Sequence, residues 1–129
     1  MYKPALNMGT IFAALAVILG AFGAHALKNM LPDDQLKIFE TGVRYQFYHS
    51  FALIITGITY QFIPAKQFKV ATILFLIGIL FFSGSLYAMS ILTSKGISIG
   101  MAGIITPIGG LFFIAGWCCF LLGINNKKE

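Results

Sequence analysis

Four stretches of this chain contain no Asp, Glu, Lys or Arg and are long enough to cross a lipid bilayer. They are residues 5–24, 45–63, 70–92 and 99–124. A helix rises about 1.5 Å per residue, so roughly 20 apolar residues cover the ~30 Å hydrocarbon layer. The sequence therefore predicts an all-α integral membrane protein, a four-helix bundle in which residues 1–129 form one domain.

The composition excludes an ordinary soluble domain. Hydrophobic residues make up 58% of the chain and charged residues only 10%, whereas soluble domains carry charge on about a quarter of their residues. We therefore expect membrane lipids to solvate the outer surface. The net charge of +5 does not indicate a nucleic-acid partner, because the basic residues are scattered at segment ends instead of clustered on one face.

The second apolar stretch is preceded by an amphipathic segment. Pro32, Asp33 and Asp34 suit a helix start, where negative charge is favourable. Apolar and charged side chains then share helical spacing: Leu36, Phe39 and Val43 among Lys37, Glu40 and Arg44. We expect this segment to lie at the membrane interface, with Glu40 and Arg44 as an ion pair one turn apart.

The distribution of cations predicts the orientation. With four spans, one side carries Lys3, Lys66, Lys69, Lys127 and Lys128, and the other carries Lys28, Lys37, Arg44 and Lys95. The side richer in cations is expected to face the cytoplasm, which puts both termini inside a cytoplasmic (inner) membrane. A cleaved signal peptide ending near Ala24 is the alternative, but the first apolar stretch exceeds a normal signal segment and more spans follow.

Small residues predict where helices approach closely, because helix pairing in lipid depends on tight packing. The first span carries such a stripe in Gly9, Ala13, Ala16, Gly20 and Gly23. In the fourth span we expect Gly103, Pro107 and Gly110 to form the packing face, with Gly109, Gly116 and Gly123 on a neighbouring face. Pro107 also predicts a kink, with Thr106 helping to satisfy the backbone.

Polar side chains recur at helical spacing inside the second and third spans and should point inward. The candidate polar pocket consists of His25, Tyr45, Gln46, His49, Ser83, Tyr87 and Ser90. We expect the two histidines at similar depth, either bonded to neighbouring helices or, as an alternative, ligating haem or a metal ion. Two imidazoles without a further ligand are a weak metal pattern, so no cofactor is expected. Cys118 and Cys119 are expected to pack, with acylation as the alternative.

Five short segments together resemble a known family. They are residues 20–25, 41–49, 82–87, 106–110 and 115–117. In order and spacing they are similar to the small bacterial inner-membrane proteins of the YgdD and YwdK family, domain of unknown function 423, which has mitochondrial relatives in animals. The resemblance implies four spans with both termini inside, and it brings no established activity, cofactor or catalytic residue.

These observations leave three functional hypotheses. The first is a non-enzymatic structural or accessory bundle that acts through lipid, its own oligomer or a membrane protein partner. The second is a small homo-oligomeric carrier or channel with a polar pocket around His25, His49 and Tyr87. The third is a haem or metal protein that uses the two histidines. No sequence motif of hydrolases, metalloproteases or nucleotide-binding enzymes occurs, so we expect no enzyme.

Overall fold

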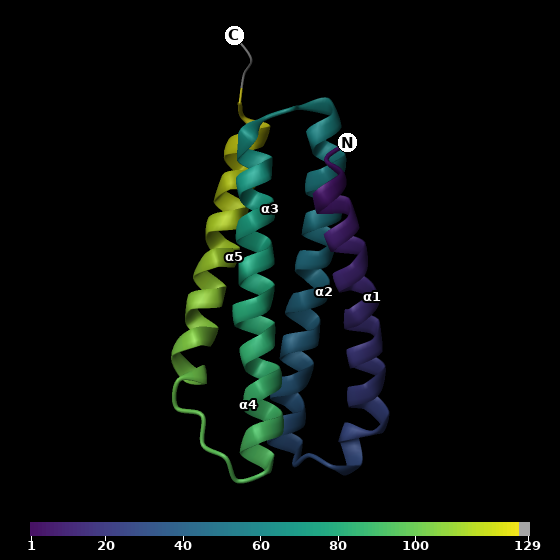
Figure 1. Ribbon diagram of the computed structural model, residues 1–129, viewed down its shortest axis with the longest axis vertical. Helices are drawn as coiled ribbons and strands as arrows, with labels where there is room; N and C mark the ends of the chain where they lie inside the picture. Colours follow the sequence, from purple (N-terminus) through teal and green to yellow (C-terminus); the bar gives the residue numbers. More distant parts are fainter. Residues whose placement is uncertain (127–129) are drawn as a thin grey trace.

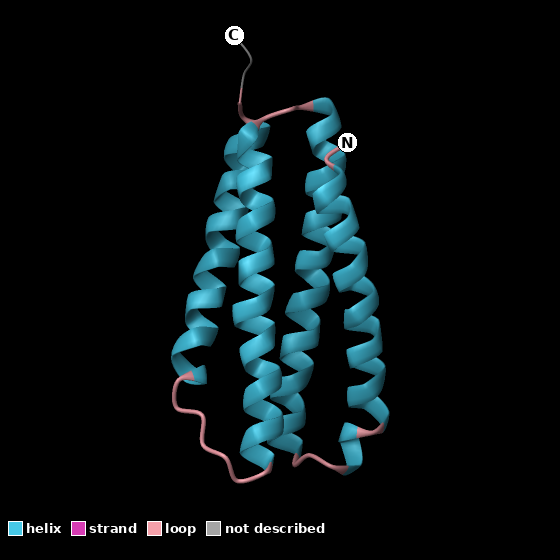
Figure 2. Ribbon diagram, in the orientation of Figure 1, coloured by secondary structure: helices cyan, strands magenta, loops and turns pink. Residues whose placement is uncertain are grey.

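The computed structural model describes residues 1–126 and consists of long helices joined by short loops (Figures 1 and 2). In chain order these are α1 (Lys3–His25), the 3-10 turn η1 (Leu27–Asn29), α2 (Asp33–Phe62), α3 (Lys66–Gly78), the π-helical turn η2 (Ile79–Ser83), α4 (Gly84–Ser94) and α5 (Ala102–Ile124). No strand occurs in this described range. Because α3, η2 and α4 follow one another as one rod, the molecule has four long helices, and the predicted all-α membrane bundle is confirmed.

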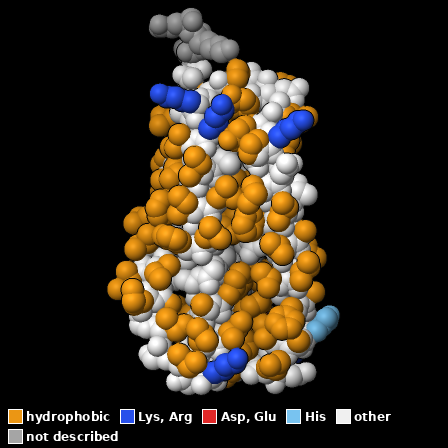
Figure 3. Space-filling view, in the orientation of Figure 1, with side chains coloured by type: hydrophobic (Ala, Val, Ile, Leu, Met, Phe, Trp, Pro, Cys, Tyr) orange, Lys and Arg blue, Asp and Glu red, His pale blue; other side chains and the backbone are white. Residues whose placement is uncertain are grey.

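Within residues 1–126, three helical stretches are both long and apolar enough to cross a membrane: Lys3–Asn29, Lys66–Ser94 and Ala102–Ile124. Hydrophobic side chains cover the middle of the visible face, and Lys and Arg side chains gather toward its two ends (Figure 3). Exposed large apolar residues are frequent on α1 and α5. This pattern requires an apolar solvent around the middle of the bundle.

The remaining long helix, α2, is 30 residues long but more polar than the others. Its polar side chains Gln46, His49, Ser50 and Thr56 are all buried. Because α2 packs against α1 on one side and against α4 and η2 on another, these groups bond inside the protein instead of facing lipid. Burial against other helices therefore accounts for these four polar side chains of α2.

The helices form two antiparallel pairs. The first pair is α1 with α2, and the second is α5 with α3 and η2. Contacts of α2 with α4 and η2 join the two pairs, so α1 and α5 lie at opposite edges of the bundle in Figure 1.

Small residues of α1 make the first pair close. A Cβ atom at Gly9 would lie 2.8 Å from the Ser50 carbonyl oxygen, and one at Gly23 would lie 3.1 Å from the Phe39 ring. At Gly20 the nearest atom, in Val43, would be 3.4 Å away, which is an ordinary contact. The backbones of α1 and α2 therefore touch most tightly at Gly9.

The second pair combines glycines of α5 with phenylalanines of α3 and η2 at matching steps of seven residues. Gly123 faces Phe68, Gly116 faces Phe75, and Gly109 faces Phe82. Gly78 reverses the pattern and faces Phe113 of α5. At Gly123, Gly116 and Gly78 a phenylalanine ring fills the space that the missing side chain leaves, and at Gly109 the backbone of Phe82 does so, which lets the helices approach closely.

This register corrects the packing face expected for the fourth span. A Cβ atom at Gly103 would have nothing within 4 Å, and one at Gly110 would meet Phe82 only at 3.8 Å. Pro107 is exposed as well. The face that packs is the neighbouring one with Gly109 and Gly116, because only that face meets the row of phenylalanines.

A π-helical turn, η2, interrupts the regular α-helical backbone of the third rod. Helix α5 continues through Pro107 to Ile124, and the Thr106 hydroxyl donates to the Ala102 carbonyl oxygen over 2.9 Å. In the third rod the π-helical turn η2 separates α3, which packs mainly on α5, from α4, which packs mainly on α2. The wider turn of η2 allows the same rod to pack on α5 along α3 and on α2 along α4.

Candidate functional site

Gln46 connects three helices in the middle of the bundle. Its side chain is 3% exposed. The amide Nε2 donates to the Phe12 carbonyl oxygen of α1 over 2.9 Å, and the amide Oε1 accepts from the Tyr87 hydroxyl of α4 over 2.7 Å. Since both ends of the amide are bonded, Gln46 is held in one orientation.

Tyr87 and Ser83 attach the third rod to α2 around Gly42. The Tyr87 ring lies so close to Gly42 that a Cβ atom there would approach it to 2.8 Å, and it also packs on Phe39 with ring centroids 4.9 Å apart. Ser83 donates its hydroxyl to the Gly42 carbonyl oxygen over 2.7 Å. Ser90 bonds only within its own helix, to the Tyr87 carbonyl oxygen over 2.9 Å.

His49 bonds through both ring nitrogens. Nδ1 lies 2.8 Å from the Tyr45 carbonyl oxygen, and Nε2 lies 3.2 Å from the indole Nε1 of Trp117 on α5. A carbonyl oxygen can only accept and an indole N–H can only donate, so Nδ1 carries the hydrogen and Nε2 accepts. The neutral Nδ1–H imidazole is the form that satisfies both partners, and it joins α2 to α5.

A further polar contact joins α4 to α5. Ser85 and Thr106 share a hydrogen bond between their hydroxyls, and each hydroxyl also lies 2.9 Å from a carbonyl oxygen that can accept from it, that of Phe82 for Ser85 and that of Ala102 for Thr106. Neither Ser85 nor Trp117 belonged to the predicted pocket. Ser85 is two residues from Ser83 and so lies on another face of the helix, and Trp117 stands in an apolar run. The spacing of polar residues therefore does not predict the bonds of Ser85 to Thr106 and of Trp117 to His49.

His25 does not lie with the other candidate residues. It is exposed at the end of α1, two residues beyond Gly23, which packs beside Phe39. His49 lies ten residues farther along α2 than Phe39, about 15 Å at the helical rise. The expectation that both histidines lie at similar depth is therefore wrong, and they cannot ligate one metal or haem iron in this fold.

Tyr45 contributes its backbone more than its side chain. Its carbonyl oxygen holds His49, while its ring packs on Phe82 with centroids 4.7 Å apart and is 37% exposed. The predicted pocket thus resolves into cross-links between helices and a remainder without such links. The cross-links are those of Gln46 with Tyr87, of His49 and of Ser83; Ser90 bonds locally, and His25 and Tyr45 lie at the surface. Within residues 1–126 no group of three His, Cys, Asp or Glu residues could hold a metal ion.

These cross-links are hydrogen bonds between groups of the protein itself. Both ends of the Gln46 amide and both nitrogens of His49 are bonded to partners on the protein. In an apolar bundle such bonds fix the register of the helices and avoid the cost of unpaired polar groups. Cys118 is an exposed free thiol on α5, and Cys119 is half-buried.

Comparison with known proteins assigns the family. The family described as "Protein of unknown function (DUF423)" matches residues 19–110. The UPF0382 membrane protein YwdK of Bacillus subtilis is 40% identical over 120 residues, covering 89% of this chain and 90% of the relative. The UPF0382 inner membrane protein YgdD of Escherichia coli K12 is 32% identical over 123 residues, covering 92% and 90%.

A third relative is similar to the chain over a comparable length. The UPF0382 membrane protein SH2409 of Staphylococcus haemolyticus is 40% identical over 115 residues, covering 89% of each protein. No solved structure matches the chain. From the family match and the identities over most of its length, the chain belongs to the DUF423 family of membrane proteins.

Proposed function

We propose that the protein is a non-enzymatic helix bundle of the inner membrane that acts through its lipid-facing surface, by contacts with lipid, with a second copy or with another membrane protein. The observation that carries this proposal is that the buried polar groups bond to one another and to the backbone across helices. Gln46, His49 and Ser83 bond to other helices, while much of the outer surface is apolar. The chain thus keeps its polar chemistry for cohesion and presents its surface to the membrane.

The proposed topology has four crossings, α2 included, with both termini in the cytoplasm. The N-terminus and the end of α5 lie at the same end of the bundle (Figure 1). Lys3, Lys66 and Lys69 belong to helix starts at that end, and Lys127 and Lys128 follow α5 outside the described residues. Cations near span ends favour the cytoplasmic side. The name of the E. coli relative, an inner membrane protein, supports the compartment.

Complementation of a deletion strain tests the non-enzymatic role. We expect a chain with His25→Asn, His49→Phe and Tyr87→Phe to restore the wild-type phenotype, because these changes remove acid–base groups while keeping two of the three aromatic rings in place. Membrane abundance and thermal stability in detergent are measured alongside. Loss of rescue by a protein of normal abundance and stability would overturn the proposal. The single Tyr87→Phe chain is the milder control if the triple variant does not accumulate.

The carrier or channel hypothesis needs a solvated path through the bundle. Gln46, His49 and Ser83 are buried, and their polar side-chain atoms are bonded within the protein. None of the three lines the groove between α1 and α2. A path through these residues would therefore require bonded groups to separate or several copies to assemble. Proton and ion flux into vesicles that contain the purified protein is the direct measurement, and protein-dependent flux would favour the carrier.

A further inference from the structure

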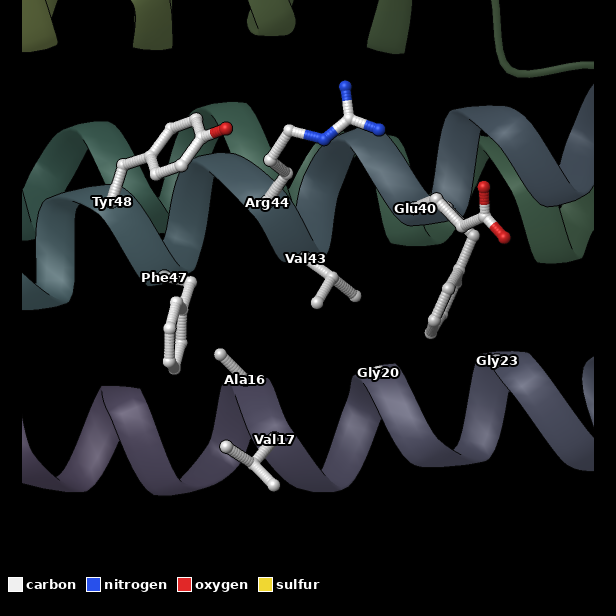
Figure 4. Close-up of a pocket in the computed structure, with 10 residues that line it drawn as sticks. Ala16, Val17, Gly20, Gly23, Glu40, Val43, Arg44, Phe47 and Tyr48 are labelled. Carbon is white, nitrogen blue, oxygen red and sulfur yellow. The ribbon is translucent and has the colours of Figure 1, made fainter.

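A groove of about 420 Å³ runs between α1 and α2 on the half of the bundle remote from the termini. Its lining, shown in Figure 4, comprises Ala16, Val17, Gly20, Gly23, Phe39, Glu40, Val43, Arg44, Phe47 and Tyr48. The volume is within the range of small-molecule sites. Because α1 offers mainly glycine and alanine here, its side of the groove is shallow and smooth.

The chemistry of the groove changes in a fixed order along its length. Toward the middle of the bundle it is bounded by Val17 and Phe47, which are apolar. One helical turn outward from Phe47 and Tyr48 stands Arg44, beside the level of Gly20, and one further turn outward stands Glu40, near Gly23. The order from the membrane interior outward is therefore apolar, cationic, anionic.

The two charges do not neutralise each other. Glu40 and Arg44 are both exposed. In Figure 4 their charged groups point in different directions, the Arg44 guanidinium to the side of α2 remote from α1 and the Glu40 carboxylate along the helix toward its start. The ion pair expected from their spacing is thus not formed. Both residues line the groove from its α2 side, and because both are exposed, each charge is available to a ligand.

We propose that this groove binds a zwitterionic aminophospholipid, with an acyl chain along Val17 and Phe47, the phosphate at Arg44 and the primary ammonium at Glu40. A phospholipid presents these three groups in the same order from the membrane interior to water. A guanidinium is well suited to a phosphate, and a carboxylate accepts hydrogen bonds from an ammonium. The inference rests on the lipid-facing role proposed above and names one lipid class and one site for it.

The carboxylate argues for this class over the alternatives. A lipid with an anionic headgroup would satisfy Arg44 but bring negative charge toward Glu40. A helix of a second copy could fill the apolar half but would need its own charges at matching positions to satisfy Arg44 and Glu40. In the proposed topology, the site faces the leaflet opposite the termini.

Lipid retention on the purified full-length protein tests the site. Protein in detergent is mixed with equal amounts of dioleoyl phosphatidylethanolamine, dioleoyl phosphatidylcholine and dioleoyl phosphatidylglycerol, and the lipids that remain bound are counted by native mass spectrometry. The variants are Arg44→Gln, Glu40→Gln and Gly20→Leu, which fills the groove. The matched controls are Lys37→Gln, an exposed charge of α2 that does not line the groove, and Gly103→Leu, which faces open space.

We expect the wild-type protein to retain phosphatidylethanolamine preferentially. Arg44→Gln should lower its retention about tenfold, as expected for loss of a charge-assisted hydrogen bond. Glu40→Gln should chiefly remove the preference over phosphatidylglycerol, and Gly20→Leu should abolish retention. Lys37→Gln and Gly103→Leu should behave as wild type.

Three results would overturn the proposal: equal retention of the three lipids by the wild type, equal loss in Arg44→Gln and Lys37→Gln, or a lipid-free dimer that Gly20→Leu dissociates. The last result would assign the groove to a second copy. None of them bears on rescue by the His25, His49 and Tyr87 substitutions, so this inference can fail while the non-enzymatic role stands.

Discussion

The imidazole of His49 lies flat against the ring of Phe113, with ring centroids 3.5 Å apart and an angle of 8° between the planes. The same imidazole bonds to Trp117, one turn farther along α5. Phe113 in turn fills the space opposite Gly78 of α3. His49 of α2 therefore contacts two side chains of α5, and one of them, Phe113, packs against Gly78 of α3. These contacts couple the two antiparallel helix pairs.

The bond between His49 and Trp117 should contribute a small but measurable part of the stability. We expect His49→Phe and Trp117→Phe each to lower the free energy of unfolding, with a coupling of about 0.6 kcal/mol and not above about 2 kcal/mol, the range seen for hydrogen bonds between membrane helices. A double-mutant cycle measured by reversible unfolding in mixed micelles gives this value. Strictly additive effects would show that the bond contributes nothing beyond the two ring contacts.

The bond between Tyr87 and Gln46 predicts an asymmetry between its two partners. Tyr87→Phe removes the donor but keeps the ring on Gly42 and Phe39, so we expect a loss of about 1 kcal/mol. Gln46→Leu should cost more, because it leaves the Tyr87 hydroxyl without its acceptor and removes the bond to α1. Tyr48→Phe, at an exposed tyrosine of α2, is the control. Equal losses in all three variants would contradict this account.

Glycines of α5 should differ sharply in their tolerance of a methyl group. At Gly109 a Cβ atom would collide with the Phe82 backbone, so Gly109→Ala should destabilise the protein by about 1–3 kcal/mol. At Gly103 the same change meets open space, and alanine's better helix propensity should leave stability unchanged or raise it by up to about 1 kcal/mol. Thermal unfolding in detergent compares the two. A Gly103→Ala protein as unstable as Gly109→Ala would refute the helix register.

The sequence was sufficient for the helices and for the small-residue face of α1, because apolar length and glycine spacing are properties of a single segment. It was insufficient for α5, where glycines stand on two neighbouring faces. The choice between Gly103 and Gly109 depends on the phenylalanines of another helix, which lie at Phe75 and Phe82 in a register set by the whole bundle.

The candidate site failed in the same way at His25. The ends of the apolar stretches place His25 and His49 near one membrane boundary. In the structure α2 begins at Asp33, well before its apolar part, and the α2 residue beside Gly23 is Phe39, ten residues before His49. Gln46 and Tyr87 were foreseen as inward polar residues. Their partners, among them the backbone carbonyl of Phe12, were not, because a carbonyl group has no sequence pattern.

The proposed crossing of α2 can be decided by labelling its two ends, since α2 is less apolar than the three helical stretches that are apolar enough to cross a membrane. In a Cys118→Ala, Cys119→Ala background, Lys37→Cys and Lys66→Cys place one exposed thiol before and one after the apolar part of α2. We expect a membrane-impermeant maleimide added to intact spheroplasts to label Lys37→Cys only, because Lys66 lies at the end that carries the N-terminus and cations favour the cytoplasmic side. Disrupted membranes, in which both thiols should react, are the control. Labelling of both positions in intact spheroplasts would mean that α2 stays on one side of the membrane, and the polar cross-links at Gln46 and His49 would then need a different solvent around them.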